Sequence, residues 1–113
     1  MCIRDSLSTA WDLSTASYAS ETFSVASQET APLGVSFNHE GTQMFIVGSG
    51  VDTVYQYSLS TGFDVTTASY DSLSFNVNAQ ESVPNSVTFS ADGTKMYVVG
   101  SISDTVHQYS TGL

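Results

Sequence analysis

The sequence predicts an all-β protein, on three observations: a long internal repeat, apolar residues spaced as in strands, and turn residues between them. Shifting the chain by 52 residues aligns 7–58 with 59–110 without a gap, and 28 of the 52 positions are identical. No segment places apolar residues three, four and seven positions apart, so we expect essentially no helix.

Within one repeat, the expected strands follow in order along the chain. The first covers about 17–25, and the second contains Val35 and Phe37, which alternate with polar neighbours. The run 44–47 is continuously apolar, which is typical of a strand buried on both faces. A loop over 48–52 leads to a fourth strand over 54–58, where polar residues alternate with tyrosines.

The turn residues between these strands are also repeated. Asp92-Gly93 predicts a hairpin with a type I′ turn, because both residues accept positive φ angles. His39-Glu40-Gly41 occupies the same place in the first copy, and Ser60-Thr61-Gly62 marks the turn into the last strand of a unit.

Four strands in a unit that cannot bury both of its own faces predict a β-propeller fragment of about two four-stranded antiparallel blades. With the strands of a blade labelled A to D, the chain is divided into a non-native or disordered tail (1–6), repeat 1 (7–58) and repeat 2 (59–113). Each repeat contributes strands in the order D, A, B, C. A β-solenoid or a sandwich remains the alternative.

One part of the repeat resembles the YVTN-type propeller repeat of lactonase-like and bacterial surface proteins. The resemblance rests on DGTKMYVVG at 92–100 and DTV at 104–106, and it covers nearly the whole chain from Leu7. The turn lacks the usual proline at Ala91, Asp104 stands where the family has Asn, and the insert that begins at Leu59 lengthens the repeat. The resemblance implies the fold, and such folds serve enzymes, adhesins and scaffolds alike.

Two blades cannot close a ring, because propellers contain about four to eight. Either the chain is cut from a longer propeller, which we favour, or several copies assemble and the first D strand completes a neighbour's last blade. Residues 1–5 resemble the translated end of a transposon adapter used in sequencing libraries, which supports the first alternative.

The composition limits the partners. Eleven acidic residues against Arg4 and Lys95 give a net charge of −9, so we expect no nucleic acid as a ligand. No apolar run is long enough for membrane insertion. Cys2 is the only cysteine, so no disulfide forms within the chain. Acidic, Ser- and Thr-rich β-proteins are often extracellular or lie on a cell or virion surface, although the compartment stays unknown.

Ring geometry gathers the D–A and B–C loops at one end, where propellers usually bind ligands. The candidate ligand-binding residues there are Gln28, Glu29, Ser49, Asp52, Gln80, Glu81, Ser101 and Asp104. Such carboxylates and amides suit Ca²⁺ or a sugar. Because they recur in both copies, the stronger interpretation is that they hold the loops together.

No catalytic or metal-binding pattern stands out, and no cofactor is expected. His39 and His107 break the repeat but are predicted to lie apart, and no serine has the Gly-x-Ser-x-Gly setting of a nucleophile. Trp11 and Phe63 are expected to fill gaps between blades rather than to stack on a sugar.

We therefore expect a non-catalytic binding or structural module, with neighbouring blades or other copies of the chain as partners and a carbohydrate or protein as ligand. The alternative is a fragment of a lactonase-like hydrolase whose catalytic residues lie in other blades.

Overall fold

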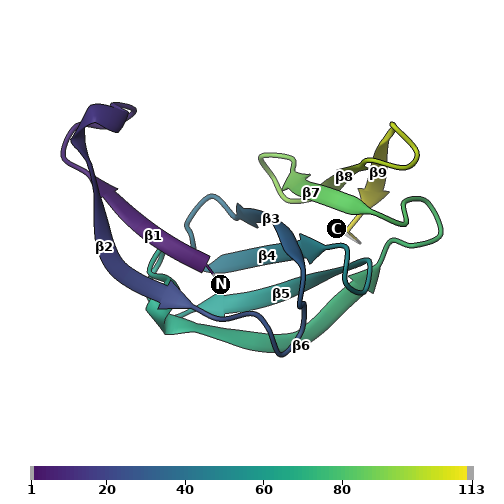
Figure 1. Cartoon of the computed structure of the whole chain (residues 1–113), viewed down its shortest axis with the longest axis horizontal. Helices are drawn as coiled ribbons and strands as arrows, with labels where there is room; N and C mark the ends of the chain where they lie inside the picture. The colour runs from purple at the N-terminus through teal and green to yellow at the C-terminus, as the bar shows by residue number, and fades with distance from the viewer. Residues whose placement is uncertain (1, 112–113) are drawn as a thin grey trace.

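The computed structural model describes residues 2–111, and it describes side chains from Ser6 onward except that of Leu7. This part of the chain is all-β, as the sequence predicts, and forms three antiparallel sheets with no closed barrel among them (Figure 1). The strands are β1 (Cys2–Leu7), β2 (Ala16–Phe23), β3 (Pro32–Phe37), β4 (Gln43–Gly48), β5 (Thr53–Leu59), β6 (Ala68–Asn76), β7 (Pro84–Phe89), β8 (Lys95–Gly100) and β9 (Val106–Ser110).

The sheets contain sequence neighbours in simple order. β1 pairs with β2, the four-stranded sheet has the order β3-β4-β5-β6, and the three-stranded sheet has the order β7-β8-β9. The four-stranded sheet takes three strands from the first repeat and β6 from the second, as the expected strand order requires. Register recurs with the repeat, since Tyr57 pairs with Tyr70 in β6 as Asp5 pairs with Tyr18 in β2.

The amino terminus differs from the expected disordered tail. The backbone from Cys2 to Leu7 forms β1, which pairs with β2 along its length. The physical reason is position, because these residues stand 52 places before β5 and satisfy the same edge of a β2 that is equivalent to β6. Whether residues 1–5 derive from an adapter stays a prediction, and Met1 lies outside the described residues.

The tight turns are not of the predicted type I′. Only the glycines have positive φ, +72° at Gly41 and +75° at Gly93, whereas type I′ needs two such residues. The Gly93 N–H donates to the Ser90 carbonyl at 3.0 Å, which closes the turn. Asp92 contributes through its side chain instead, because its Oδ1 accepts from the Thr94 N–H (3.1 Å) and the Ser90 hydroxyl (2.8 Å).

Two single turns of 3₁₀ helix were missed by the expectation of no helix. They are η1 (Leu13–Thr15) and η2 (Val65–Thr67), and each follows an aspartate whose side chain accepts from a backbone N–H two residues later. Apolar periodicity does not reveal a helix this short. The aromatic residue before each aspartate, Trp11 or Phe63, has a positive φ of about 60° that turns the chain into the helix.

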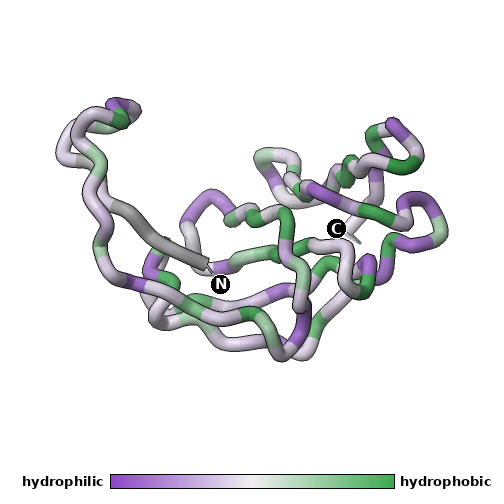
Figure 2. The backbone as a smooth tube through the Cα atoms, in the orientation of Figure 1, coloured by the Kyte–Doolittle hydropathy of each residue, from purple (hydrophilic) through white to green (hydrophobic). Residues whose placement is uncertain are grey.

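The core lies on both faces of the four-stranded sheet, because β4 is central and buries alternate residues on opposite sides (Figure 2). Met44 and Ile46 pack in one cluster with Val25, Tyr57, Leu59 and Val65. On the other face, Val47 and Val54 pack with Val77, Val87, Met96 and Val98. The second cluster joins the four-stranded and three-stranded sheets, and β7 packs against β3 and β4.

Candidate functional site

The structure brings together the two loops that the sequence assigns to one end of each unit. In the first unit, the loop between β2 and β3 contacts the loop between β4 and β5, because the Ser49 N–H donates to the Ala31 carbonyl at 3.2 Å. In the second unit, the Ser101 N–H donates to the Val83 carbonyl at the same distance. The predicted residues therefore lie at one end of their units, although they do not form one open site.

Glu29 and Glu81 are the centres of these loop pairs. Their side chains are 0% and 1% exposed. Glu29 Oε1 accepts from the N–H groups of Ala31 (2.8 Å) and Gly50 (3.0 Å), so its carboxylate joins both loops. The Glu81 carboxylate does the same for Val83 (2.9 Å) and Ser103 (3.1 Å). A ligand reaches neither carboxylate unless a loop opens, so both glutamates serve the loops.

The glutamines next to these glutamates anchor tyrosines. Gln28 Oε1 accepts from the Tyr57 hydroxyl at 3.1 Å, and Gln80 Oε1 accepts from the Tyr109 hydroxyl at 3.0 Å. Each bond ties the loop before the first strand of a sheet to that sheet's third strand. Gln28 is half-buried, whereas Gln80 is exposed.

The remaining candidates differ between the two copies. Asp52 is half-buried, and its Oδ2 accepts from the Asn78 side-chain amide at 2.8 Å, while its Oδ1 is buried without a hydrogen-bond partner among the described residues. Asp104, Ser49 and Ser101 are exposed. These three residues and Gln80 are therefore the predicted positions that a ligand can reach from solvent.

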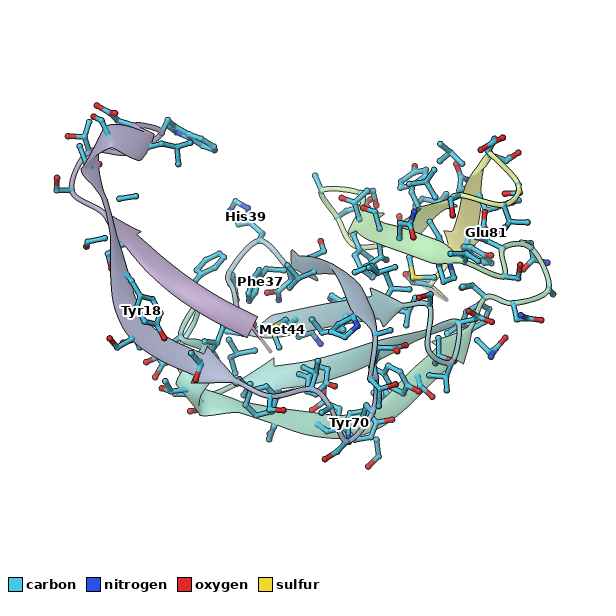
Figure 3. The ribbon with its side chains drawn as sticks, in the orientation of Figure 1. Tyr18, Phe37, His39, Met44, Tyr70 and Glu81 are labelled. Carbon is cyan, nitrogen blue, oxygen red and sulfur yellow. The ribbon has the colours of Figure 1, made fainter. Side chains whose placement is uncertain are left out.

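The two histidines lie apart, as their strand positions predict. His39 is exposed at the turn after β3, and Glu81 lies well away from it in the loop before β7 (Figure 3). His107 lies on β9, where its Nε2 is 3.1 Å from the Ser103 hydroxyl.

The contact at Ser103 does not have the arrangement of a catalytic triad. The Ser103 hydroxyl donates its single proton to Glu81 Oε2 at 2.7 Å, so the hydroxyl lies between the carboxylate and the imidazole. A triad needs the imidazole in the middle, where it removes the hydroxyl proton. The first copy has Val51 and Tyr55 at the positions of Ser103 and His107, so this contact belongs to the second copy alone.

Neither metal nor membrane features stand out in the part of the chain that the structure describes. Within residues 2–111, no three His, Cys, Asp or Glu side chains gather as a metal site would need. Over the same residues, no helix has the length and apolar character to cross a membrane.

Acid is expected to loosen the second loop pair. The Ser103 hydroxyl and then the Val83 N–H hold the pKa of Glu81 at about 2, below its usual 4.5. A carboxylate with a lowered folded-state pKa stabilises the fold fully above its unfolded-state value and loses this effect as the pH falls through the folded-state pKa. We expect the melting temperature to fall between pH 4.5 and 2, and to fall less steeply in Glu81→Gln.

Asp92 adds to the same pH range, because the Thr94 N–H and the Ser90 hydroxyl lower its pKa to about 2. Asp104→Asn serves as the control, since it removes an exposed carboxyl outside both loop bonds. Thermal melts by circular dichroism at each pH give the measurement. An unchanged acid slope in Glu81→Gln would contradict the role assigned to Glu81.

Comparisons with protein-family models, with curated proteins and with solved structures return no match to this chain. The resemblance to YVTN-type repeats therefore stays a prediction. The sequence analysis missed the contact of Glu81 with Ser103 and His107. Its only signal was that two positions four residues apart, 103 and 107, both depart from the repeat.

Proposed function

We propose that the chain is a non-catalytic binding or structural module made of β-propeller blades. The single observation that carries this proposal is the shared apolar core between two sheets of the same repeat. Val47 and Val54 of one sheet pack against Val87, Met96 and Val98 of the next. Sheets that stack face to face with consecutive antiparallel strand order suit propeller blades.

The use of the repeated polar residues supports a binding role over catalysis. Glu29 and Glu81 hold loops together in both copies, so they stabilise the unit rather than face a substrate. The same loop end presents exposed Ser49 and Ser101 beside exposed apolar Val51 and Ile102, which are 47% and 64% exposed. Small hydroxyl and apolar side chains suit an uncharged ligand, such as a neutral carbohydrate or an uncharged protein surface.

Location follows from the same surface. The net charge of −9 disfavours polyanions, and a surface rich in Ser and Thr is typical of secreted, cell-surface or virion-associated proteins. The lactonase-like hydrolase is the competing proposal, in which other blades of a longer protein supply the catalytic groups.

The proposal is tested by nuclear magnetic resonance with the full chain and a panel of neutral oligosaccharides. We expect shift changes in the loops 49–52 and 101–105 and none with heparin, the anionic control. Shift changes confined to other segments would contradict the ligand-binding end proposed here.

Catalysis is tested with a simple γ-lactone in a pH-stat. We expect no hydrolysis above the buffer rate. Hydrolysis that is lost in Asp104→Asn would overturn the non-catalytic proposal, because that substitution removes an accessible carboxylate at the loop end.

A further inference from the structure

β5 and β9 occupy the same position in the repeat but have different neighbours. β5 pairs with β4 on one edge and β6 on the other. β9 pairs with β8, and no strand of the described residues pairs with its other edge. The chain nevertheless contains a strand equivalent to β6, because β2 lies 52 residues before it and pairs with β1 in matching register. β1, in turn, stands where β9 would stand.

We propose that a second copy of this chain supplies its β2 to the open edge of β9 and gives up its own β1 in exchange. The pairing of β5 with β6 fixes the register, since both strands have equivalents 52 residues away. The expected partners, with the second copy's residue after each arrow, are Val106↔Phe23, His107↔Thr22, Gln108↔Glu21, Tyr109↔Tyr18 and Ser110↔Ser17.

The loop before β2 carries an aromatic side chain that fits an empty position on the first copy. In the filled unit, the Phe63 ring covers Gly41 and lies 5.6 Å from the Phe37 ring. In the open unit, nothing lies within 4 Å of where a Cβ of Gly93 would be. Trp11, equivalent to Phe63 and with nearly the same φ, is 100% exposed. The segment with η1 stands away from the other sheets (Figure 1).

An open groove of about 830 Å³ receives this segment. Its lining includes Phe89, Gly93, Met96, Tyr109 and Thr111 from the three-stranded sheet. These are the equivalents of the residues around Phe63 and Val65 in the filled unit. Val65 is 2% exposed there, whereas its equivalent Leu13 is 83% exposed and available to fill the groove.

Apolar residues on both copies are left uncovered in matching positions. Val99 and Val106 on β8 and β9 are 38% and 66% exposed, whereas the equivalent Val47 and Val54 are 0% and 5% exposed. Val35 on β3 is 53% exposed, whereas the equivalent Val87 is 2% exposed. Stacking of the completed sheet on the second copy's four-stranded sheet brings these three valines together, as their equivalents meet in the core.

Two features oppose the exchange. Ala10 stands where the filled unit has Gly62, and a Cβ at Gly62 would lie 2.5 Å from the Glu40 carbonyl oxygen. Ala10 therefore requires a small shift of the turn at Asp92. Each copy also has a net charge of −9, so the copies repel each other at low salt. We expect Ala10→Gly and added salt to strengthen the assembly.

Each copy donates one β2 and accepts one, so the contact is head-to-tail and closes into a ring. The number of copies rests on the proposed function, because a propeller of about four to eight blades needs two to four chains of two blades each. The pairing itself rests on the β5–β6 register alone. Exchange also leaves no open sheet edge, which removes a template for aggregation.

The assembly is tested by light scattering during size-exclusion chromatography of the full chain at several concentrations. We expect a closed species at a small multiple of 12.0 kDa. Trp11→Ser is expected to raise the concentration of half-dissociation at least tenfold without altering the single chain, because Trp11 is exposed there. Ile102→Ser removes an equally exposed apolar side chain outside the contact and is the matched control. A wild type that stays monomeric would overturn the proposal.

The register is tested by mixing two variants in a Cys2→Ser background. Ser17→Cys and Ser110→Cys face each other only across the exchanged strands, so mixing them under oxidising conditions is expected to give a disulfide-linked pair. Ser110→Cys mixed with Ser69→Cys is the control, since Ser69 pairs with Ser58 within one chain. An oligomer without the Ser17–Ser110 link would reject strand exchange. A monomer that still binds neutral oligosaccharides would reject it too and leave the proposed function standing.

Discussion

Replacing Tyr57 by alanine is expected to lower the free energy of unfolding by about 3–5 kcal/mol, the usual range for removing a buried aromatic ring. Tyr57 is 0% exposed. Its ring lies 5.6 Å from that of Phe23 and 5.5 Å from that of Tyr70, so it joins β2, β5 and β6. Urea unfolding followed by circular dichroism gives the measurement.

Two matched variants separate the parts of this effect. Tyr57→Phe keeps the ring and loses the bond to Gln28, so a loss of about 1 kcal/mol is expected. Tyr109→Ala tests the equivalent tyrosine, which is only half-buried, and is expected to have a smaller effect than Tyr57→Ala. If the two alanine variants unfold at the same urea concentration, the cluster around Tyr57 is not the main core.

Replacing Glu29 by alanine is expected to lower the free energy of unfolding by about 3 kcal/mol or more, although the residue is charged. The substitution leaves the N–H groups of Ala31, Gly50 and Val51 without their acceptor, and each buried unsatisfied group costs about 1–3 kcal/mol. The loops on either side of β3 and β4 then separate more easily.

Glu29→Gln is expected to recover part of this loss, because one amide oxygen still accepts while its NH₂ faces an N–H donor. Glu40→Ala removes an exposed carboxyl and is the control, expected within about 0.5 kcal/mol of wild type. Hydrogen exchange at Gly50 and Val51 locates the effect. Protected amides there in Glu29→Ala would contradict the assigned role.

The strands were largely predictable because their signal is local. The apolar run at 44–47 predicted a central strand, and the structure buries Met44 and Val47 on opposite faces of β4. The 3₁₀ turns were not predictable from apolar periodicity, since a three-residue helix presents no repeating face. The type I′ turn was wrong because Asp92 uses its side chain, not a positive φ, to close the hairpin.

The candidate site was only partly predictable. The recurrence of Glu29 and Glu81 in both copies favoured a structural role over a ligand role, and their burial between loops agrees with that interpretation. The contact from Glu81 through Ser103 to His107 depends on side chains from a loop and a strand that meet only in the fold. Sequence alone marked 103 and 107 as departures without indicating that they touch.

The sequence by itself determined the all-β class, the period of 52 residues and the order of the strands, because backbone pairing and alternation are written in nearest neighbours. Only the tertiary structure decided which of two equivalent residues is buried. Val47 and Val99 have the same local sequence setting, yet one is covered and the other is 38% exposed. Local sequence sets the direction of a side chain, whereas its burial depends on the sheet that packs against it.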